Sequence, residues 1–205
     1  AIPAIDLSVA LVNRFVTHAF GATPLPAMEL ATGVPARLRT VVAVPTLLTT
    51  RAAVAEQIER LEIHHLASPE GDLHFVLLSD WVDADNEREI ADEALLQAAS
   101  DGIAELNRRH GAAPGGDRFF LLHRRRVWNE SENRWIGWER KRGKLHELNR
   151  LLRGATDTTF LSAGGSAGQI PENVGYVITL DADTRLPRDT VRRLIGKMAH
   201  PLNKP

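Results

Sequence analysis

The chain has 205 residues, 43% of them hydrophobic, so it is long and apolar enough to bury a core of its own. Its 25 Lys and Arg residues nearly balance 26 Asp and Glu residues, which argues against a partner such as nucleic acid or an anionic membrane surface that binds through overall charge. Cysteine is absent, which excludes disulfides and cysteine-based zinc sites, and the eight histidines show no HxxxH spacing. An anionic ligand would need a local binding site.

Residues 1–36 are predicted to form an apolar helix followed by a proline-rich linker. Apolar residues recur at helical spacing after Asp6, a residue type favoured at the N-cap, so we expect a helix from Asp6 to about Phe20 that packs against another part of the protein. No run near the N-terminus approaches the ~18 apolar residues of a membrane span, so this chain by itself is expected to be soluble. The following prolines and glycines favour an extended segment, and a second domain is predicted over residues 37–205.

In that second part, short apolar runs alternate with longer segments of helical period. The predicted elements, in chain order, are a strand Thr40–Pro45, a helix with Val54, Ile58 and Leu61 on one face, a strand Leu73–Asp80, a helix through Ile90, Ala94, Ala98 and Leu106 ending at Gly111, a strand Arg118–Arg124, a tryptophan-rich hairpin turning at Glu130–Asn133, a helix Gly143–Gly154, a strand Gly175–Asp181 and a helix with Val191, Leu194, Ile195 and Met198. Strands apolar on both faces that alternate with helices predict an α/β fold, with a mostly parallel sheet covered by helices on both faces. The stretch 162–168 is expected to be a flexible loop rather than a phosphate cradle, within a longer mobile loop over residues 156–173.

Open parallel sheets bind ligands at the carboxyl ends of their strands, so the polar residues there are the candidates for a site. These residues are Pro45 and Thr46, Ser79 and Asp80, the run from His123, and Asp181. Asp80 can accept hydrogen bonds from a nucleobase or ribose, or it caps the next helix. The basic residues around Gly143, with free backbone N–H groups at a helix start, suit a diphosphate, or they form a solvated turn. The tryptophans are expected to pack over the sheet rather than stack on a sugar.

The stretch YVITLDADTRLP places Asp181 and Asp183 on the same side of an extended chain, so both carboxylates can face one divalent cation. The alternative is that Asp181 caps the following turn and Asp183 is solvated. A calcium loop is excluded because Leu186 and Arg192 stand where such a loop needs Gly and Glu. The motif also resembles the DxDxT nucleophile of haloacid-dehalogenase-type phosphatases, but it follows some 180 residues and leaves a tail too short for the other groups of that site.

Taken in order, VVAVPTLLTT, FVLLSDWVDAD, ERKRGKLHELNRLLRG and YVITLDADTRLP resemble the start of a GT-A glycosyltransferase domain. They are most similar to the glycosyltransferase family 84 domain of bacterial cyclic β-1,2-glucan synthases, from about Arg39 to Pro201. The resemblance implies a Rossmann-like, nucleotide-sugar-binding fold. It also implies inverting transfer of glucose from UDP-glucose to a β-1,2-glucan acceptor, at the cytoplasmic face of the bacterial inner membrane, within a larger membrane protein.

The resemblance also assigns residues. It implies that Pro45, Thr46 and Asp80 line a uridine pocket, and that Lys141, Gly143 and Lys144 lie near the diphosphate. The pair Asp181 and Asp183 would hold Mg²⁺ or Mn²⁺, with Asp181 also near the substrate.

The general base is expected beyond Pro205, so the chain is predicted to be the N-terminal part of a GT-A domain that binds UDP and metal without turnover. A DxDxT phosphatase and a non-catalytic nucleotide- or glucan-binding module remain as alternatives.

Overall fold

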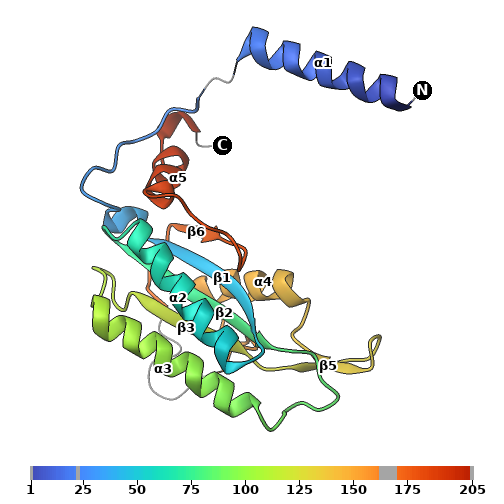
Figure 1. Cartoon of the computed structure of the whole chain (residues 1–205). Coiled ribbons are helices and arrows are strands. Elements are labelled where there is room, and N and C mark those ends of the chain that lie inside the picture. The colour runs from blue at the N-terminus through green and yellow to red at the C-terminus, as the bar shows by residue number, and fades with distance from the viewer. Residues whose placement is uncertain (1, 22–23, 162–169, 204–205) are drawn as a thin grey trace.

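A computed structural model describes residues 2–21, 24–161 and 170–203. The helices and strands, in chain order, are α1 (Ile2–Phe20), β1 (Thr40–Leu48), α2 (Arg51–Ala67), β2 (Leu73–Trp81), α3 (Asp92–His110), β3 (Phe119–Arg124), β4 (Val127–Asn129), β5 (Arg134–Ile136), α4 (Arg140–Leu152), β6 (Tyr176–Thr179) and α5 (Thr190–Met198) (Figure 1). Short 3-10 helices lie at Ala36–Leu38 and Pro201–Asn203. The predicted loop over residues 162–168 lies outside the described residues, as does most of the longer loop predicted around it.

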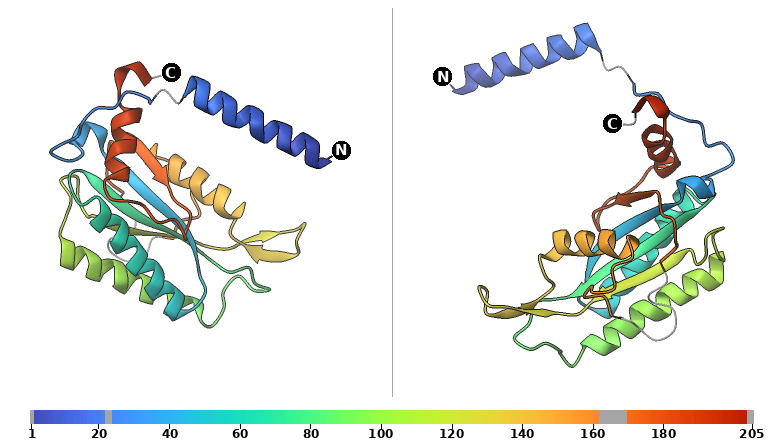
Figure 2. Two further views of the ribbon diagram at one scale, coloured as in Figure 1. Left: turned by 45° about the horizontal axis from the view of Figure 1, so that its top comes forward. Right: turned by 180° about the vertical axis from the view of Figure 1, so that it is seen from behind.

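The centre of the fold is a four-stranded sheet in the order β3-β2-β1-β6, and every pairing in it is parallel. Helices α2 and α3 cover one face and α4 covers the other (Figures 1 and 2). The predicted α/β class, with a mostly parallel sheet between helices, is confirmed, and the arrangement is Rossmann-like. The predicted hairpin is confirmed as the antiparallel pair β4-β5 with its turn over residues 130–133, and it extends from the end of the sheet.

Both faces of the sheet are buried, which explains why its strands are almost continuously apolar. On one face Phe75 and Leu77 pack with residues of α2 and α3 in the larger hydrophobic cluster. On the other face Val76 and Leu78 pack against Leu148 of α4. Burying this apolar area is the main favourable contribution to folding, at roughly 25 cal/mol per Å².

The order of the strands reverses between β1 and β6. The chain runs from β1 to β2 and then to β3 on one side, and β6 returns to pair on the opposite side of β1. In open α/β sheets a crevice forms outside the carboxyl ends of the strands at such a switch point, and ligands bind there. The topology therefore predicts a ligand-binding crevice at the carboxyl ends of β1, β2 and β6.

Strand β1 continues through Pro45 to Leu48, so the prediction that it ends at the proline is wrong. Leu180 donates its N–H to the carbonyl of Ala43, which shows that Ala43 turns its backbone toward β6. Pro45, two residues later, faces the same side, where the pairing with β6 has already ended. The missing N–H of Pro45 therefore costs the sheet no hydrogen bond.

Three predicted helix starts also differ from the structure. Helix α1 begins at Ile2, so Asp6 is inside it and is not its N-cap. Helix α3 begins at Asp92, whose carboxylate accepts the N–H of Glu89, and Ile90 lies outside the helix in solvent. Helix α4 begins at Arg140, three residues before the predicted start.

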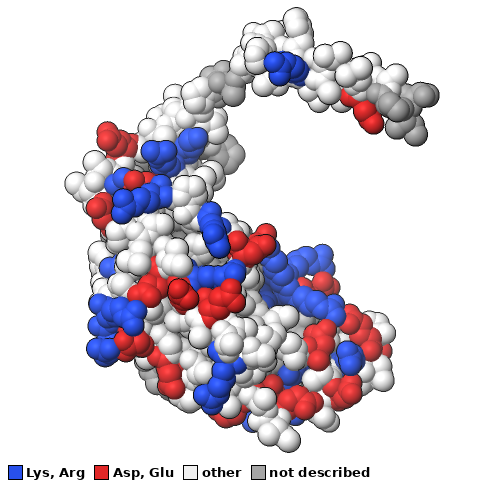
Figure 3. Space-filling view, in the orientation of Figure 1, with Lys and Arg blue, Asp and Glu red and all other residues white. Residues whose placement is uncertain are grey.

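Helix α1 projects from the rest of the chain, and its side chains from Ala4 to Phe20 are exposed (Figure 2). The expected packing of its apolar surface against another segment is not seen among the described residues. Few charged side chains lie on it (Figure 3). None of the helices in the described part of the chain combines the length and the apolarity that crossing a membrane requires.

The segment between α1 and β1 lacks helices and strands over residues 24–35, as its prolines predict, but part of it packs on the sheet domain. Leu30 and Val34 are buried in the main hydrophobic cluster. Met28 donates its N–H to the carbonyl of Gly196 in α5, and a Cβ on Gly196 would lie 2.3 Å from the Met28 oxygen. The packed domain therefore includes residues before its predicted start at Arg37.

The tryptophans of the hairpin are more exposed than predicted. Trp128 packs edge-on against Trp135 across the two strands, with ring centroids 5.8 Å apart, and is 45% exposed. Trp138, just before α4, is 44% exposed. The predicted packing over the sheet is therefore wrong for these two side chains.

Candidate functional site

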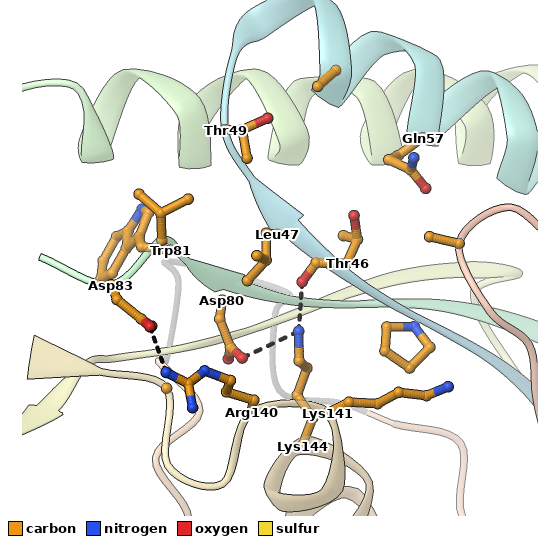
Figure 4. Close-up of a pocket in the computed structure, with 15 residues that line it drawn as sticks. Thr46, Leu47, Thr49, Gln57, Asp80, Trp81, Asp83, Arg140, Lys141 and Lys144 are labelled. Atoms are coloured by element: carbon orange, nitrogen blue, oxygen red, sulfur yellow. Dashed lines mark hydrogen bonds and ion pairs between the residues drawn. The ribbon is translucent and has the colours of Figure 1, made fainter. Parts of the chain in front are cut away.

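A pocket of about 660 Å³ opens at the switch point of the sheet (Figure 4). It is formed by the ends of β1 and β2, the start of α2, the start of α4 and the turn after β6. Its lining residues are Pro45, Thr46, Leu47, Thr49, Ala53, Gln57, Asp80, Trp81, Val82, Asp83, Gly137, Arg140, Lys141, Lys144 and Ala182. We call it the donor pocket, after the ligand proposed for it under Proposed function. Five of the residues predicted to bind substrate, Pro45, Thr46, Asp80, Lys141 and Lys144, lie together in it.

Asp80 forms the floor of the donor pocket and is 2% exposed. Arg124, the last residue of β3, binds it with two parallel hydrogen bonds, Nε to Oδ1 at 2.8 Å and Nη2 to Oδ2 at 2.9 Å. Lys144 Nζ lies 3.1 Å from Oδ2. Among the described side chains Oδ1 accepts one of these hydrogen bonds, whereas a carboxylate oxygen can accept two. The alternative role of Asp80 as a helix cap is wrong, because it lies within β2 and far from the start of α3.

Gly137 is required by the close approach of the chain to Asp80. A Cβ at this position would lie 2.6 Å from Asp80 Oδ2 and 3.1 Å from Arg124 Nη2. Any larger residue would therefore push against the ion pair at the floor of the pocket.

Lys144 ties three elements together from its position on α4. Its ammonium donates to the carbonyl of Thr46 in β1 at 2.5 Å and pairs with Asp80 at the end of β2 (Figure 4). Burial lowers the pKa of Lys144, while the charge of Asp80 acts in the opposite direction. The side chain is 4% exposed, so its charge acts in a medium where screening by water is weak.

The rim of the pocket carries two further cations from the first turn of α4. Arg140 binds Asp83 at 2.8 Å and Glu132 at 2.8 Å, and these hydrogen bonds, that to Glu132 first, raise the pKa of the guanidinium. Lys141 reaches across the pocket mouth to the carboxylate of Asp181. Both members of that last pair are exposed, so water screens their attraction and a ligand can compete for either group.

Asp181 and Asp183 do not face one point. Asp181 pairs with Lys141, while Asp183 lines a neighbouring cavity of about 500 Å³ with Glu56, Glu59, Arg60 and His64. The prediction assumed an extended chain, but β6 ends at Thr179 and a turn follows, in which Thr184 donates its N–H to the carbonyl of Asp181. The two-residue alternation of a strand does not extend through this turn.

The donors beside the donor pocket suit a divalent cation only in part. Within residues 2–21, 24–161 and 170–203, no three His, Cys, Asp or Glu side chains gather into a metal-binding group. Mg²⁺ in phosphate-binding sites often takes only one or two carboxylates and completes its shell with water and phosphate oxygens. Asp181 beside the donor pocket suits that role chemically. Asp183 could join it only if the turn changed shape.

Gly143 does not line the donor pocket, and its N–H is not free. It donates to the carbonyl of Glu139, the residue just before α4, at 3.1 Å, because the helix begins earlier than predicted. A Cβ on Gly143 would lie 1.9 Å from the carbonyl oxygen of Trp138. The structure therefore gives Gly143 a packing role, and its predicted contact with a substrate has no support in this arrangement.

Arg124 is the main site residue that the sequence interpretation did not single out. It stands opposite Asp80 in the register of β2 and β3. The signal was present in the sequence, because two opposite charges end two apolar runs that were both predicted to be strands. Neighbouring parallel strands place such ends side by side.

No family model matches the chain. Over all 205 residues it is 49% identical to the cyclic beta-(1,2)-glucan synthase NdvB of Rhizobium meliloti (strain 1021). The chain spans about 7% of the length of that curated relative. The resemblance that the four motifs indicated is thus confirmed, and it extends over the whole chain.

Proposed function

We propose that this chain is the donor-binding part of a glucosyltransferase that acts in cyclic β-1,2-glucan synthesis, with UDP-glucose as the donor. The observation that carries the proposal is the donor pocket, which combines buried Asp80 and Lys144 with the exposed cation Lys141 at the switch point of the sheet. The similarity to a protein named as a cyclic beta-(1,2)-glucan synthase supports the reaction class.

The two ends of the pocket suit the two parts of a nucleoside diphosphate. The ends of β1 and β2, with Pro45, Thr46 and the remaining acceptor position of Asp80, would receive the uridine. The start of α4 would receive the diphosphate, because Lys141 lies there and the positive end of a helix dipole favours anions. Gly143 is left out of this assignment, since its N–H is already bonded.

Cleavage of the bond to glucose leaves negative charge on UDP, and cations held in place stabilise that charge as it develops. Lys141 is free to turn from Asp181 to a phosphate, because both partners are exposed. Lys144 is fixed by Thr46 and Asp80 and adds a positive charge that does not need to move. A bound Mg²⁺ or Mn²⁺ at Asp181 would neutralise further charge on the diphosphate, with Asp183 as a second ligand only if the turn rearranges.

The proposal assigns no catalytic base to this chain. An inverting transferase needs a carboxylate that takes the proton from the acceptor hydroxyl. The two carboxylates of the donor pocket, Asp80 and Asp83, are both paired with arginines. The base and the β-1,2-glucan acceptor site would come from the rest of a larger membrane protein, with this domain at the cytoplasmic face, where UDP-glucose is made.

Calorimetric titration of the chain with UDP, with and without Mn²⁺, tests the proposal. We expect saturable binding that Mn²⁺ strengthens, a loss of that strengthening in Asp181→Asn, and binding weakened about tenfold in Lys141→Met, the size of one charge-assisted hydrogen bond. Lys197→Met on α5 is the matched control, because Lys197 is exposed and does not line the donor pocket. Absent binding of UDP, or unchanged binding in Lys141→Met, would refute the assignment. Glucose transfer by the chain alone would refute the absence of a base.

A further inference from the structure

The turn that carries both aspartates is held from α2 by Arg60. The Arg60 guanidinium donates from Nη1 to the carbonyl of Ala182 at 2.5 Å, and from Nη2 to Glu56 Oε1 at 2.6 Å. Glu56 lies one helical turn before Arg60 on the same face of α2. The guanidinium thus bridges a helix and the single residue that separates Asp181 from Asp183.

Few other polar contacts fix this segment, although Leu186 packs against the main hydrophobic cluster. The sheet ladder ends where Leu180 donates to Ala43, and the next backbone hydrogen bond to another element is from Asp189 to the carbonyl of Ala67. Between these two anchors, the side-chain bonds that reach the segment from the described parts of other elements are those of Arg60 and Lys141. The Lys141 bond is exposed and is the one that a diphosphate would break.

Holding the Ala182 carbonyl restrains the residue that lies between the two aspartates. The carbonyl belongs to the rigid peptide plane that joins Ala182 to Asp183, so its orientation sets where the chain leaves toward Asp183. Ala182 lines the donor pocket, whereas Asp183 and Arg60 line the neighbouring cavity. Arg60 therefore lies between the two cavities and holds Ala182, the residue of the turn that lines the donor pocket.

We infer that Arg60 is a positioning residue for the aspartate turn, keeping Asp181 beside the donor pocket, and that Glu56 orients its guanidinium. The inference rests on the proposed function, because it takes Asp181 to be the carboxylate that serves the donor and its cation. The effect of Arg60 is positional rather than electrostatic, since Glu56 balances its charge at 2.6 Å. No contact of Arg60 with the nucleotide is part of this role.

The first test measures the gain in UDP affinity that Mn²⁺ provides, as the ratio of affinities with the cation and with a chelator. In Arg60→Met we expect this ratio to fall about tenfold, the size of one charge-assisted hydrogen bond, while affinity for UDP without metal stays unchanged. Arg60→Lys should restore part of the ratio, because an ammonium can still donate to the carbonyl. Arg109→Met is the matched control, since Arg109 is also paired with a glutamate of α2, Glu62, and loses the same charge. An unchanged ratio in Arg60→Met would overturn the inference.

A second measurement separates this inference from the proposed function. Hydrogen exchange of the ligand-free chain should become faster over residues 181–185 in Arg60→Met, with no change in β1, and should stay as in the wild type in Arg109→Met. If the wild type shows no gain from Mn²⁺, the proposed metal role fails, and the exchange result alone decides whether Arg60 holds the turn. Unchanged exchange over residues 181–185 would overturn the inference whatever the ligand results.

Discussion

Strand β2 has a buried aspartate near each end, and the two ends differ in what surrounds the buried charge. Before the strand, Asp72 Oδ2 accepts a hydrogen bond from Arg39 Nε at 3.0 Å, while Oδ1 accepts one from the Gly115 N–H at 3.2 Å and lies 2.8 Å from His74 Nε2. At the carboxyl end, Asp80 is bound by Arg124 and Lys144. Burial and ion pairing are therefore common to both ends and do not mark a function.

The two ends are also similar in open volume. A cavity of about 560 Å³ borders Arg39 and Gly115 at the amino end, close to the 660 Å³ of the donor pocket. What differs is the charge on the rim. The amino-end cavity is lined by Asp117 and Glu172 beside Arg39, whereas the donor pocket has Arg140, Lys141 and Lys144. Cations at the carboxyl ends of the strands, rather than cavity size, therefore distinguish the end that suits a phosphate-bearing ligand.

The largest expected difference between the ends concerns stability. In Arg124→Met the buried carboxylate of Asp80 loses the guanidinium that binds it, and so do the backbone carbonyls of Trp138 and Arg140. We therefore expect a loss of about 3–5 kcal/mol in the free energy of unfolding. Arg39→Met should cost less, because the Arg39 side chain is 15% exposed and water can reach the site. Urea unfolding of both variants checks this. An equal or larger loss for Arg39→Met would show that the amino end is the tighter ion pair.

Gly143 and Gly115 are crowded by different kinds of neighbour at the two ends. Gly143→Ala would bring a Cβ against the backbone carbonyl of Trp138, which cannot move without shifting the start of α4, so we expect a cost of about 1–3 kcal/mol. Gly115→Ala would bring its Cβ against the guanidinium of Arg39, the movable end of a side chain, and should cost less. Thermal unfolding of the two variants measures the difference. If Gly143→Ala were neutral, the close approach at the start of α4 would be wrong.

Acid should lower the stability of the fold through His123, which lies near the carboxyl end of β3. Burial lowers the pKa of His123 from 6.5 to about 4, and Ser79 Oγ lies 2.7 Å from its Nδ1. The unfolded chain therefore takes up a proton between pH 6.5 and about 4 that the folded chain does not, so stability falls as pH falls through this window, by about 1–3 kcal/mol for this group.

Urea unfolding at several pH values between 7 and 4 measures that slope. In His123→Asn the slope should be shallower by the contribution of His123, while other buried histidines such as His65 still contribute. Identical slopes in the two proteins would mean that His123 keeps an ordinary pKa in the folded state.

The smallest expected effect on stability is that of Lys141→Met. The side chains of Lys141 and Asp181 are 53% and 64% exposed, and exposed ion pairs contribute about 0–1 kcal/mol. Thermal unfolding should therefore barely change, although the same variant is expected to lose UDP affinity. A strong loss of stability would assign Lys141 a structural role like that of Lys144.

Much of the fold could be predicted because the strands are buried on both faces and the helices between them are amphipathic. The runs ending at Asp80 and Arg124 were identified from composition alone, and the topology then placed their ends together. The Pro45 error arose because a proline usually ends a central strand, whereas here its N–H side faces a position that β6 no longer occupies.

The site residues were harder to predict where the local backbone conformation determines the direction of a side chain or an N–H group. The spacing of Asp181 and Asp183 predicts that both side chains point the same way only in an extended chain. The spacing does not indicate the turn, in which Thr184 donates its N–H to the carbonyl of Asp181. The contact of Arg60 with Ala182 joins residues 122 positions apart, so no local pattern indicates it. Gly143 was expected to expose its N–H because the start of α4 was placed three residues too late.

Where UDP binds can be mapped by following the backbone amide signals of the chain in nuclear magnetic resonance spectra during a titration with UDP. We expect saturable shifts at residues 46–49, 81–83 and 140–144, which surround the donor pocket, and none at residues 115–117 beside the amino-end cavity. Saturable shifts centred on residues 115–117, or no saturable shift at the donor pocket, would contradict this expectation.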